Sequence, residues 1–448
     1  ADGADIITAS AGTSNVRVGV NAGNSIVSGA YYNVLVGDEA GTAITTGDYN
    51  IALGHQALET MTGGQSNIAI GYQALKTANV ASGLQYNVAI GYLAGTAVTT
   101  GINNTLIGAL SGDALTEGSN NTALGINSLG ADTLGSRNTA IGYNTLLVQN
   151  FTSATNSYNV AMGHDAGREI TTGIFNTLIG GLAGDALSDA DTNVAIGASS
   201  LTTDTKGSKS VAVGHSALEA QNFTTSTNSY NTAIGADSGK GITTGTLNTL
   251  IGALSGTHGA DLSTGINNIC IGYDNGVQPT GSNQIVIGTG FVTAGDNDFS
   301  FGKAGSVVTN DFDADANWSR SSDERLKKNI TDQKLGLDFI NDLRTVKYNW
   351  KPSHELDSTD SQLSHLYKEK EADNEMNTTV TMHNFIAQEV KTALDKAGVS
   401  DFAGWKEDQY GVQQVSREMF IIPLVKAMQE LSAQVTALTA RVTELEGE

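Results

Sequence analysis

Residues 87–91 read NVAIG, and 17 residues later residues 104–108 read NTLIG. This core of asparagine, three small or apolar residues and glycine returns along most of the chain, usually at steps of 17 residues. Steps of 20 or 21 residues interrupt the period four times. A repeat of this length is typical of solenoids, in which each repeat forms one rung. The cores begin at Asn15, Asn33, Asn50, Asn67, Asn87, Asn104, Asn121, Asn138, Asn159, Asn176, Asn193, Ser210, Asn231, Asn248, Asn268 and Gln284.

Each core predicts a short β-strand, because Val, Ile, Thr and Leu favour the pleated backbone. The glycine that follows predicts a turn that needs a positive φ or has no room for a Cβ. The second half of a repeat, such as residues 41–47 (GTAITTG), predicts another short strand. We expect the asparagines to stack in a ladder that satisfies backbone groups of the turns. The fold class predicted is mainly β, with a shaft that is a parallel β-roll or β-solenoid.

The strand cores are apolar at every position, as in Val88, Ala89 and Ile90. A thin roll has a single interior, so a second apolar face predicts packing against other chains. A closed threefold assembly suits a fibre, and we therefore predict a homotrimer.

Composition excludes several classes of protein. The chain has 448 residues, 53 Gly, 3 Pro and one cysteine, with a formal net charge of −22. Collagen, a disulfide framework and binding to nucleic acid are therefore not expected. No run of 18 apolar residues is present, so membrane insertion is not expected either. We predict no cofactor and no metal.

Charge density divides the chain near residue 318. Residues 1–317 contain 32 charged residues, whereas residues 318–448 contain 38 in less than half the length. We predict a repetitive shaft over 1–290, an acidic neck or linker over 291–321, and a C-terminal domain over 322–448 with a coiled coil at 421–446. The neck is expected to be solvated, and its acidic residues are Asp296, Asp298, Asp311, Asp313 and Asp315.

Three histidines, His55, His164 and His215, directly follow a rung glycine, where several other rungs have tyrosine. They could fill a flat aromatic slot, or in a trimer three imidazoles could surround a metal. We favour the slot, because no neighbouring carboxylate recurs. Cys270 lies where other rungs have Ala or Leu, which predicts a small buried hydrophobic residue.

The segment 321–330 (SSDERLKKNI) is the most informative of the C-terminal part. A serine is a nucleophile only with a base, and a lysine can be that base once burial or positive charge lowers its pKa. Ser322 and Lys327 could form such a pair, with Arg325 and Lys328 as the neighbouring charges. From spacing alone, Ser322 as the N-cap of an exposed helix is the better interpretation.

Two resemblances are carried by these motifs. Rungs such as NVAIGYLAG and NTAIGYNTL resemble the β-roll heads of trimeric autotransporter adhesins and, more closely, repeats of phage tail fibres. The run SDERLKKNI resembles the start of the self-cleaving intramolecular chaperone of endosialidase tailspikes and many tail fibres. Residues 346–351 (VKYNWK), 384–390 (NFIAQEV) and 421–429 (IIPLVKAMQ) resemble later segments of that domain. Asn384 replaces a glycine of the family, and residues 353–379 look like an exposed insertion.

This resemblance implies that three chaperone domains assemble and that each chain cuts itself between Ser321 and Ser322. Ser322 is then the nucleophile and Lys327 the base, while Asp323 and Arg325 have orienting or structural roles. The implied enzyme is a single-turnover Ser/Lys endopeptidase with no activity on external substrates.

The last thirty residues predict a coiled coil independently of the resemblance. Apolar residues follow a heptad pattern, with alternating steps of three and four. This seam consists of Ile421, Leu424, Met428, Leu431, Val435, Leu438, Val442 and Leu445.

The function predicted is that of a phage tail fibre or tailspike shaft that folds in the host cytoplasm and functions in the virion. Its expected partners are two further copies, a host cell-surface receptor of glycan or protein nature, and other tail proteins. Because the chain begins at Ala1, we interpret it as a fragment whose missing N-terminal part attaches to the tail. The alternatives are a bacterial trimeric surface adhesin, or a polysaccharide-degrading tailspike whose catalytic domain lies outside this sequence.

Overall fold

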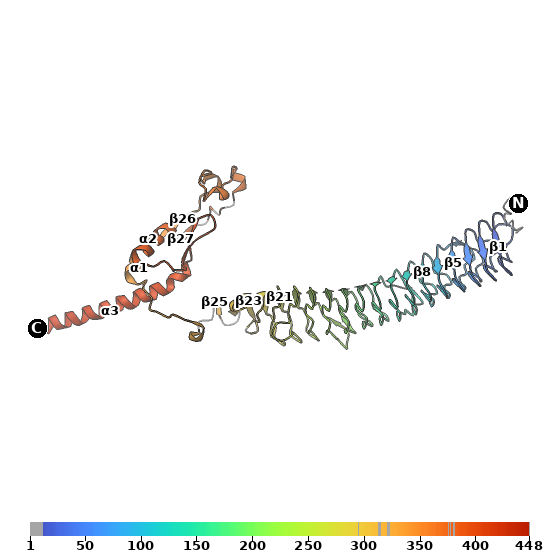
Figure 1. Ribbon diagram of the computed structural model, residues 1–448, viewed down its shortest axis with the longest axis horizontal. Helices are drawn as coiled ribbons and strands as arrows, with labels where there is room; N and C mark the ends of the chain where they lie inside the picture. Colours follow the sequence, from blue (N-terminus) through green and yellow to red (C-terminus); the bar gives the residue numbers. More distant parts are fainter. Residues whose placement is uncertain are drawn as a thin grey trace. The chain divides into compact units, whose positions relative to one another are not determined.

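The computed structural model describes residues 12–293, 295–311, 315–319, 323–374, 376, 378–379 and 381–447. The chain divides into two compact units, Ala1–Ser321 and Ser322–Glu448. The first unit is an elongated β-solenoid, and the second is a mixed α/β unit that ends in a long helix (Figure 1).

Within the described residues, each of the sixteen repeat cores contains one short strand directly after its first residue, and consecutive strands pair in parallel. The register joins equivalent positions, as in Val88 with Thr105 and Ala89 with Leu106. The predicted parallel β-solenoid is therefore confirmed. These strands are β1 Val16–Val18, β2 Val34–Val36, β3 Ile51–Leu53, β5 Ile68–Ile70, β7 Val88–Ile90, β8 Thr105–Ile107, β9 Thr122–Leu124, β11 Thr139–Ile141, β13 Val160–Met162, β14 Thr177–Ile179, β15 Val194–Ile196, β17 Val211–Val213, β19 Thr232–Ile234, β20 Thr249–Ile251, β21 Ile269–Ile271 and β22 Ile285–Thr289.

The asparagines form the expected ladder inside the solenoid. Asn104 is fully buried, and its backbone N–H donates to Oδ1 of Asn87 in the preceding rung (2.9 Å). Its Nδ2 donates to the carbonyl of Gly118 in the following rung (2.8 Å). Each amide thus satisfies backbone groups of two neighbouring rungs, which a buried polar side chain must do to be tolerated.

The rung glycines are required both by backbone conformation and by space. Gly180 has a φ of +140°, and a Cβ at this position would lie 2.5 Å from the carbonyl oxygen of Gly197 in the next rung. A side chain would therefore be strained and would force the stacked rungs apart.

Among the described residues, the second half of the repeat forms no strand except at the insertions described below, so the prediction of a second strand in every repeat was wrong. In residues 41–47 the backbone turns instead, because Glu39 (φ 60°) and Gly41 (φ 57°) are both left-handed. Hydrogen bonds still connect the rungs there, for example from Ala43 N–H to the Glu59 carbonyl (3.0 Å). Two left-handed residues so close together bend the chain too sharply for a strand.

Three of the longer repeats carry an inserted loop. At each insertion two short strands pair in parallel, outside the main sheet. They are β4 Gly64–Gln65 with β6 Gly83–Leu84, β10 Gly135–Ser136 with β12 Thr155–Asn156, and β16 Gly207–Ser208 with β18 Thr227–Asn228.

The sheet continues beyond residue 290. β23 (Asp298–Lys303) pairs in parallel with β22, and β24 (Ser306–Asp311) and β25 (Asp315–Ser319) then add antiparallel strands. Asp298, which we expected to be solvated, is buried, and its carboxylate accepts the Gly295 N–H (2.7 Å). Asp313 lies outside the described residues.

In its described residues the C-terminal unit combines short strands with three α-helices, and its core contains both aliphatic and aromatic side chains. Phe420 packs against Phe339, Phe385 and Phe402, with ring centroids 4.8–6.1 Å apart. The elements are η1 Glu324–Leu326, α1 Leu337–Asn341, β26 Val346–Tyr348, η2 Ser353–Glu355, η3 Ser364–Leu366, η4 Glu371–Asp373, β27 Met382–Asn384, α2 Ala387–Ala397, β28 Trp405–Glu407, β29 Gln413–Val415, η5 Arg417–Phe420 and α3 Ile421–Glu446.

Candidate functional site

The predicted scissile pair, Ser321 and Ser322, lies outside the described residues. The structure begins again at Asp323, which is the N-cap of η1 and accepts the Arg325 N–H (2.9 Å). The helix cap that the spacing assigned to Ser322 therefore belongs to Asp323. Lys327 follows as the C-cap of this single turn, and its side chain is exposed.

Arg325 and Asp323 form a two-pronged ion pair. The guanidinium donates through Nε to Oδ1 (3.0 Å) and through Nη2 to Oδ2 (2.6 Å). These bonds, with the Arg325 N–H and the charge of Lys327, lower the pKa of the Asp323 carboxyl below its usual range. The sequence offered two roles for Arg325, a positive charge near Lys327 and an orienting or structural role. The ion pair with Asp323 is compatible with the second role, which stays a prediction.

Helix α3 contacts the N-terminal end of helix α1, which follows the motif segment in the chain. The Glu430 carboxylate accepts the Leu337 N–H (2.7 Å), and Lys426 lies 3.4 Å from the same carboxylate. A Cβ on Gly336 would lie 2.6 Å from Glu430 Oε1, so a side chain there would require the Glu430 carboxylate to shift. These contacts lower the pKa of Glu430.

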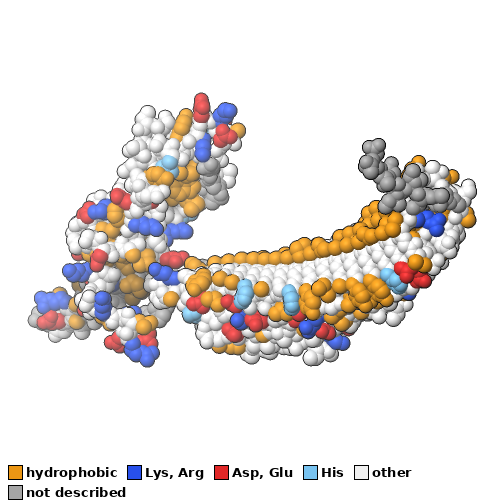
Figure 2. Space-filling model, turned by 45° about the vertical axis from the view of Figure 1, so that its right-hand side comes forward, with side chains coloured by type: hydrophobic (Ala, Val, Ile, Leu, Met, Phe, Trp, Pro, Cys, Tyr) orange, Lys and Arg blue, Asp and Glu red, His pale blue; other side chains and the backbone are white. Residues whose placement is uncertain are grey.

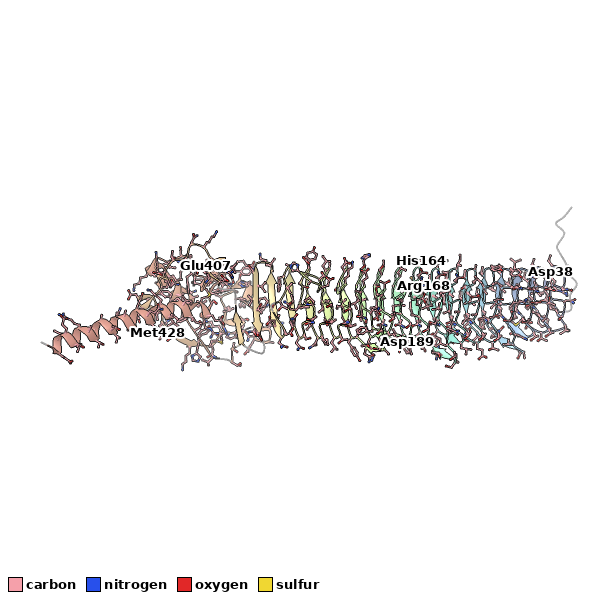
Figure 3. All side chains as sticks on the ribbon, turned by 90° about the horizontal axis from the view of Figure 1, so that it is seen from below. Asp38, His164, Arg168, Asp189, Glu407 and Met428 are labelled. Atoms are coloured by element: carbon pink, nitrogen blue, oxygen red, sulfur yellow. The ribbon has the colours of Figure 1, made fainter. Side chains whose placement is uncertain are left out.

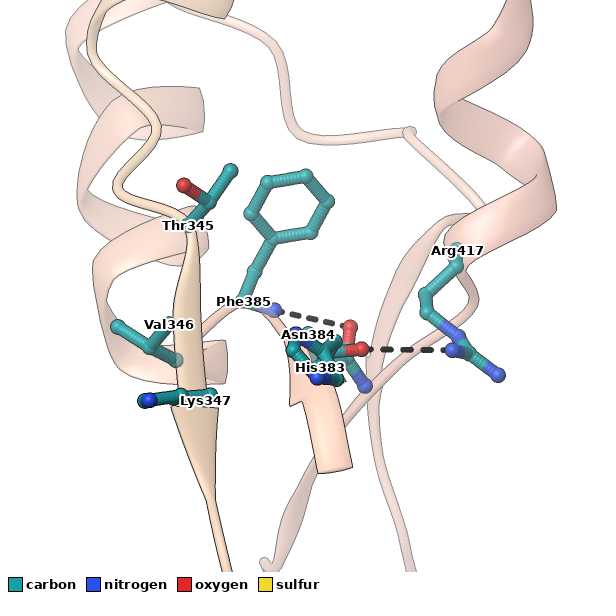
Figure 4. A pocket seen from close by; sticks show the side chains of 7 residues that line it. All are labelled: Thr345, Val346, Lys347, His383, Asn384, Phe385 and Arg417. Atoms are coloured by element: carbon teal, nitrogen blue, oxygen red, sulfur yellow. Dashed lines mark hydrogen bonds between the residues drawn. The ribbon is translucent and has the colours of Figure 1, made fainter. Parts of the chain in front are cut away.

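Two segments that resemble the chaperone family meet at a pocket of about 420 Å³. Figure 4 shows Val346 and Lys347 on β26 beside His383 and Asn384 on β27, with Arg417 opposite. Arg417 Nη1 donates to the His383 carbonyl (3.3 Å). The sequence did not single out Arg417, since it lies 33 residues beyond Asn384 and no local pattern marks it.

Helix α3 exposes an apolar stripe along its length. All eight seam residues are exposed in the single chain, from 43% for Val442 to 70% for Met428. On the same helix only Pro423 and Ala427 are buried among the described residues. An isolated helix with such a stripe is typical of one strand of a coiled coil.

The solenoid has a second exposed apolar surface on its sheet. In the core strands from β2 to β22 the second residue is buried, as are Ala89 and Leu106, whereas Arg17 of β1 is only partly buried. The third residue points outward. This third residue is apolar in all sixteen core strands, and Phe301 of β23, which pairs with Ile287, continues the column. Figure 2 shows hydrophobic side chains gathered in a band along the solenoid. We call this column the outer ridge. It comprises Val18, Val36, Leu53, Ile70, Ile90, Ile107, Leu124, Ile141, Met162, Ile179, Ile196, Val213, Ile234, Ile251, Ile271, Ile287 and Phe301.

Two of the three histidines fill an aromatic slot. His55 stacks on Tyr72 with ring centroids 5.5 Å apart, and His164 stacks on Tyr143 at 5.3 Å. The described residues contain no group of three or more His, Cys, Asp or Glu side chains arranged to hold a metal. Figure 3 shows His164 at one edge of the solenoid and Asp189 at the opposite edge.

Cys270 is fully buried, and burial raises the pKa of its thiol to about 12. It is a small core residue, as predicted. Among the described residues, no helix has the length and apolar character needed to cross a lipid bilayer.

Comparison with known families identifies the C-terminal unit. Residues 322–399 match the model of a peptidase family described as "Chaperone of endosialidase". The searches of curated proteins and of solved structures returned no match. The chain therefore carries an intramolecular chaperone domain of this family after a long β-solenoid. Domains of this family are typical of phage tail fibres and act in trimeric proteins.

Proposed function

We propose that this chain belongs to a trimeric phage tail fibre or tailspike, in which the chaperone domain assembles the shaft and then releases itself. The observation that carries this proposal is the family match that begins at residue 322, directly after the solenoid unit ends at Ser321. The shaft that remains would contact a receptor on the host cell.

The two exposed apolar surfaces support the trimer. Seventeen outward residues in one column would lose most of their contact with water if three solenoids packed around an axis. The seam residues of α3 would also lose most of their contact with water if three copies of this helix packed together. Parallel chains in equal register bring like residues together in both places, as closed threefold symmetry requires.

Cleavage would use the two ends of the Ser322–Lys327 motif. Lys327 in its neutral form accepts the proton of the Ser322 hydroxyl, and the oxygen attacks the carbonyl carbon of Ser321. The peptide bond breaks as the Ser322 nitrogen takes up a proton, which leaves an ester between the two serines. Water then hydrolyses the ester, yielding a Ser321 carboxylate and restoring the Ser322 hydroxyl.

Assembly before cleavage follows from the topology. Rung-to-rung contacts of three parallel chains offer no local nucleus, whereas a helical seam can pair quickly. Cutting afterwards separates the unfolding route from the folding route, so the mature shaft is kinetically trapped.

The test is a denaturing gel with intact-mass measurement. We expect fragments 1–321 and 322–448, the smaller beginning at Ser322. Ser322→Ala and Lys327→Ala should leave the full-length chain, while the matched control Lys328→Ala should still be cut. Continued cleavage at this bond in Ser322→Ala would contradict the assignment.

A further inference from the structure

Two of the inserted loops of the solenoid are copies of each other. Residues 150–156 read NFTSATN and residues 222–228 read NFTTSTN, 72 residues further on. Both follow a buried glutamine and lead into a two-residue strand. Each loop therefore arises where the four-rung unit was duplicated, and both keep the same polar composition.

The bases of the two loops are built alike from buried polar groups. Gln149 Nε2 donates to Asp132 Oδ2 (2.6 Å), and Gln221 Nε2 donates to Asp204 Oδ2 (2.6 Å). In the second copy the same carboxylate also accepts the backbone N–H of Phe223 (3.0 Å). Such satisfied buried networks hold a loop in one conformation before any ligand binds.

In the first copy the equivalent aromatic residue is Phe151. Its N–H donates to Asp132 Oδ1 (3.4 Å), and its ring, like that of Phe223, is only 6% exposed. Each phenylalanine thus anchors its loop to the solenoid, and the residues that follow project outward.

The tips of both loops expose hydroxyl groups. Thr152 and Ser153 in the first loop, and Thr224, Thr225 and Ser226 in the second, are exposed. Within the described part of the chain, none of these five side chains makes a hydrogen bond. Their donors and acceptors are therefore available to a ligand, at positions that the buried bases hold rigid.

We propose that these two loops form a repeated binding site for a neutral, hydroxyl-rich polysaccharide. The shaft is strongly acidic, with 8 basic and 24 acidic residues in positions 1–317, so it repels anionic polymers. Three cations close to the loops in the chain already have partners. Arg137 lies 5.2 Å from the ring centroid of Tyr158, Lys209 lies 5.1 Å from that of Tyr230, and Lys206 lies 3.6 Å from the Asp189 carboxylate. Uncharged hydroxyls and amides are what remain to recognise a ligand.

The spacing favours a polymer over a single sugar. Four rungs separate the loops, which corresponds to about 19 Å at the spacing of parallel strands. A chain of repeating sugars that lies along the shaft can occupy both loops at once, and the second contact then forms at high effective concentration. This inference rests on the proposed role of the shaft in contacting a host surface.

The remaining inserted loop is an internal control. Residues 79–84 read NVASGL, with one hydroxyl and mainly small or apolar residues at the tip. Met61 takes the place of the buried aspartate, and the Gln85 side-chain nitrogen has no partner in the described structure. This loop is therefore not expected to bind.

The experiment measures binding of the full chain to immobilised mannan, dextran and galactan, with alginate and hyaluronate as acidic counterparts. We expect the wild type to bind at least one neutral polymer and neither acidic one. Thr152→Ala with Ser153→Ala should weaken apparent affinity on the order of 100-fold through lost avidity. Adding Thr224→Ala, Thr225→Ala and Ser226→Ala should abolish binding, and Ser82→Ala should change nothing.

Three outcomes would overturn the inference: no binding to any neutral polymer, unchanged binding in the five-site variant, or preference for the acidic polymers. Light scattering and the cleavage gel, run on the same preparations, report separately on the proposed function. If the chain is cut and trimeric but binds no neutral polymer, only the proposed loop site is contradicted. If the chain binds a neutral polymer but is neither cut nor trimeric, the proposed function is contradicted and the loop site is supported.

Discussion

The most unusual residues in the interior of the solenoid are two buried carboxylates, Asp132 and Asp204. Asp132 and Asp204 are fully buried without a cationic partner in the described residues, and each is held by a glutamine amide and backbone N–H groups. Burial outweighs these hydrogen bonds and raises the pKa of both carboxyls. The folded chain therefore binds these two protons more tightly than the unfolded chain does.

The first prediction concerns pH. A carboxyl whose folded pKa is raised adds stability that is fully present below its unfolded pKa and is lost as pH rises through the folded value. We expect these two groups to raise the melting temperature of the wild type as pH falls through their folded pKa toward the ordinary value of 3.8. Asp132→Asn with Asp204→Asn should flatten this rise, and each single variant should do so by about half, since the sites are far apart. An unchanged pH profile in the double variant would show that neither group titrates in this range.

The second prediction uses two adjacent glycines. Gly180→Ala puts a Cβ against the Gly197 carbonyl at a φ of +140°, whereas a Cβ on Gly181 meets no atom within 4 Å. We expect Gly180→Ala to cost at least about 2 kcal/mol per chain. Gly181→Ala should be nearly neutral. Thermal unfolding of the two variants measures the difference, and equal melting temperatures would contradict the stacking argument.

At the scale of elements, helix α3 is the part of the C-terminal unit whose exposed surface is least suited to water. Its seam residues are 43–70% exposed in the single chain, although the helix is otherwise anchored to α1 through Glu430. A single helix gains little from such a stripe, since its stability comes mostly from packing an apolar face. The element therefore depends on partners.

The third prediction tests this dependence. Leu431→Asp with Leu438→Asp places six charges in the core of a trimer, and we expect light scattering to detect monomers or aggregates in place of trimers. The matched control is Ala433→Asp with Ala440→Asp, which adds the same charges on the opposite face at similar cost in helix propensity. A trimer that survives the seam variant but not the control would place the interface elsewhere.

At the scale of the whole molecule, folding and persistence of the shaft are separate problems. Rungs are bonded to residues far along the chain, as in Val88 with Thr105, 17 positions away, and Asn104 with Gly118, 14 positions away. The first correct rung pairing therefore offers little stabilisation before several have formed. Once complete, the ladder has few open ends, and unfolding must break many rungs at once.

The fourth prediction follows. Residues 1–321 expressed alone should aggregate, whereas the same fragment produced by cleavage of the full chain should be soluble, trimeric and slow to denature. Size-exclusion chromatography of both preparations, with unfolding rates in denaturant, is the measurement. If the fragment expressed alone gave the same soluble trimer, the chaperone role would have to be abandoned even with cleavage intact.

The repeat sequence by itself determined the solenoid, its register and the asparagine ladder. These features recur at fixed steps, and a stack of identical rungs converts a period in sequence directly into columns in space, as with Asn87 above Asn104. The burial of Cys270 and the stacking of His55 and His164 could be predicted for the same reason. Each residue has the same surroundings as the residues at the equivalent position of the other repeats.

Only the tertiary structure decided the features that depend on residues without a repeated neighbour. The sequence predicted a strand at residues 41–47, where left-handed residues form turns instead. It also predicted that Asp298 is solvated, whereas the end of the sheet buries this residue. It assigned the cap to Ser322, although the structure gives it to Asp323, and it missed Arg417 at the pocket. In each case the local pattern allowed two conformations or environments, and contacts made by the folded chain selected one of them.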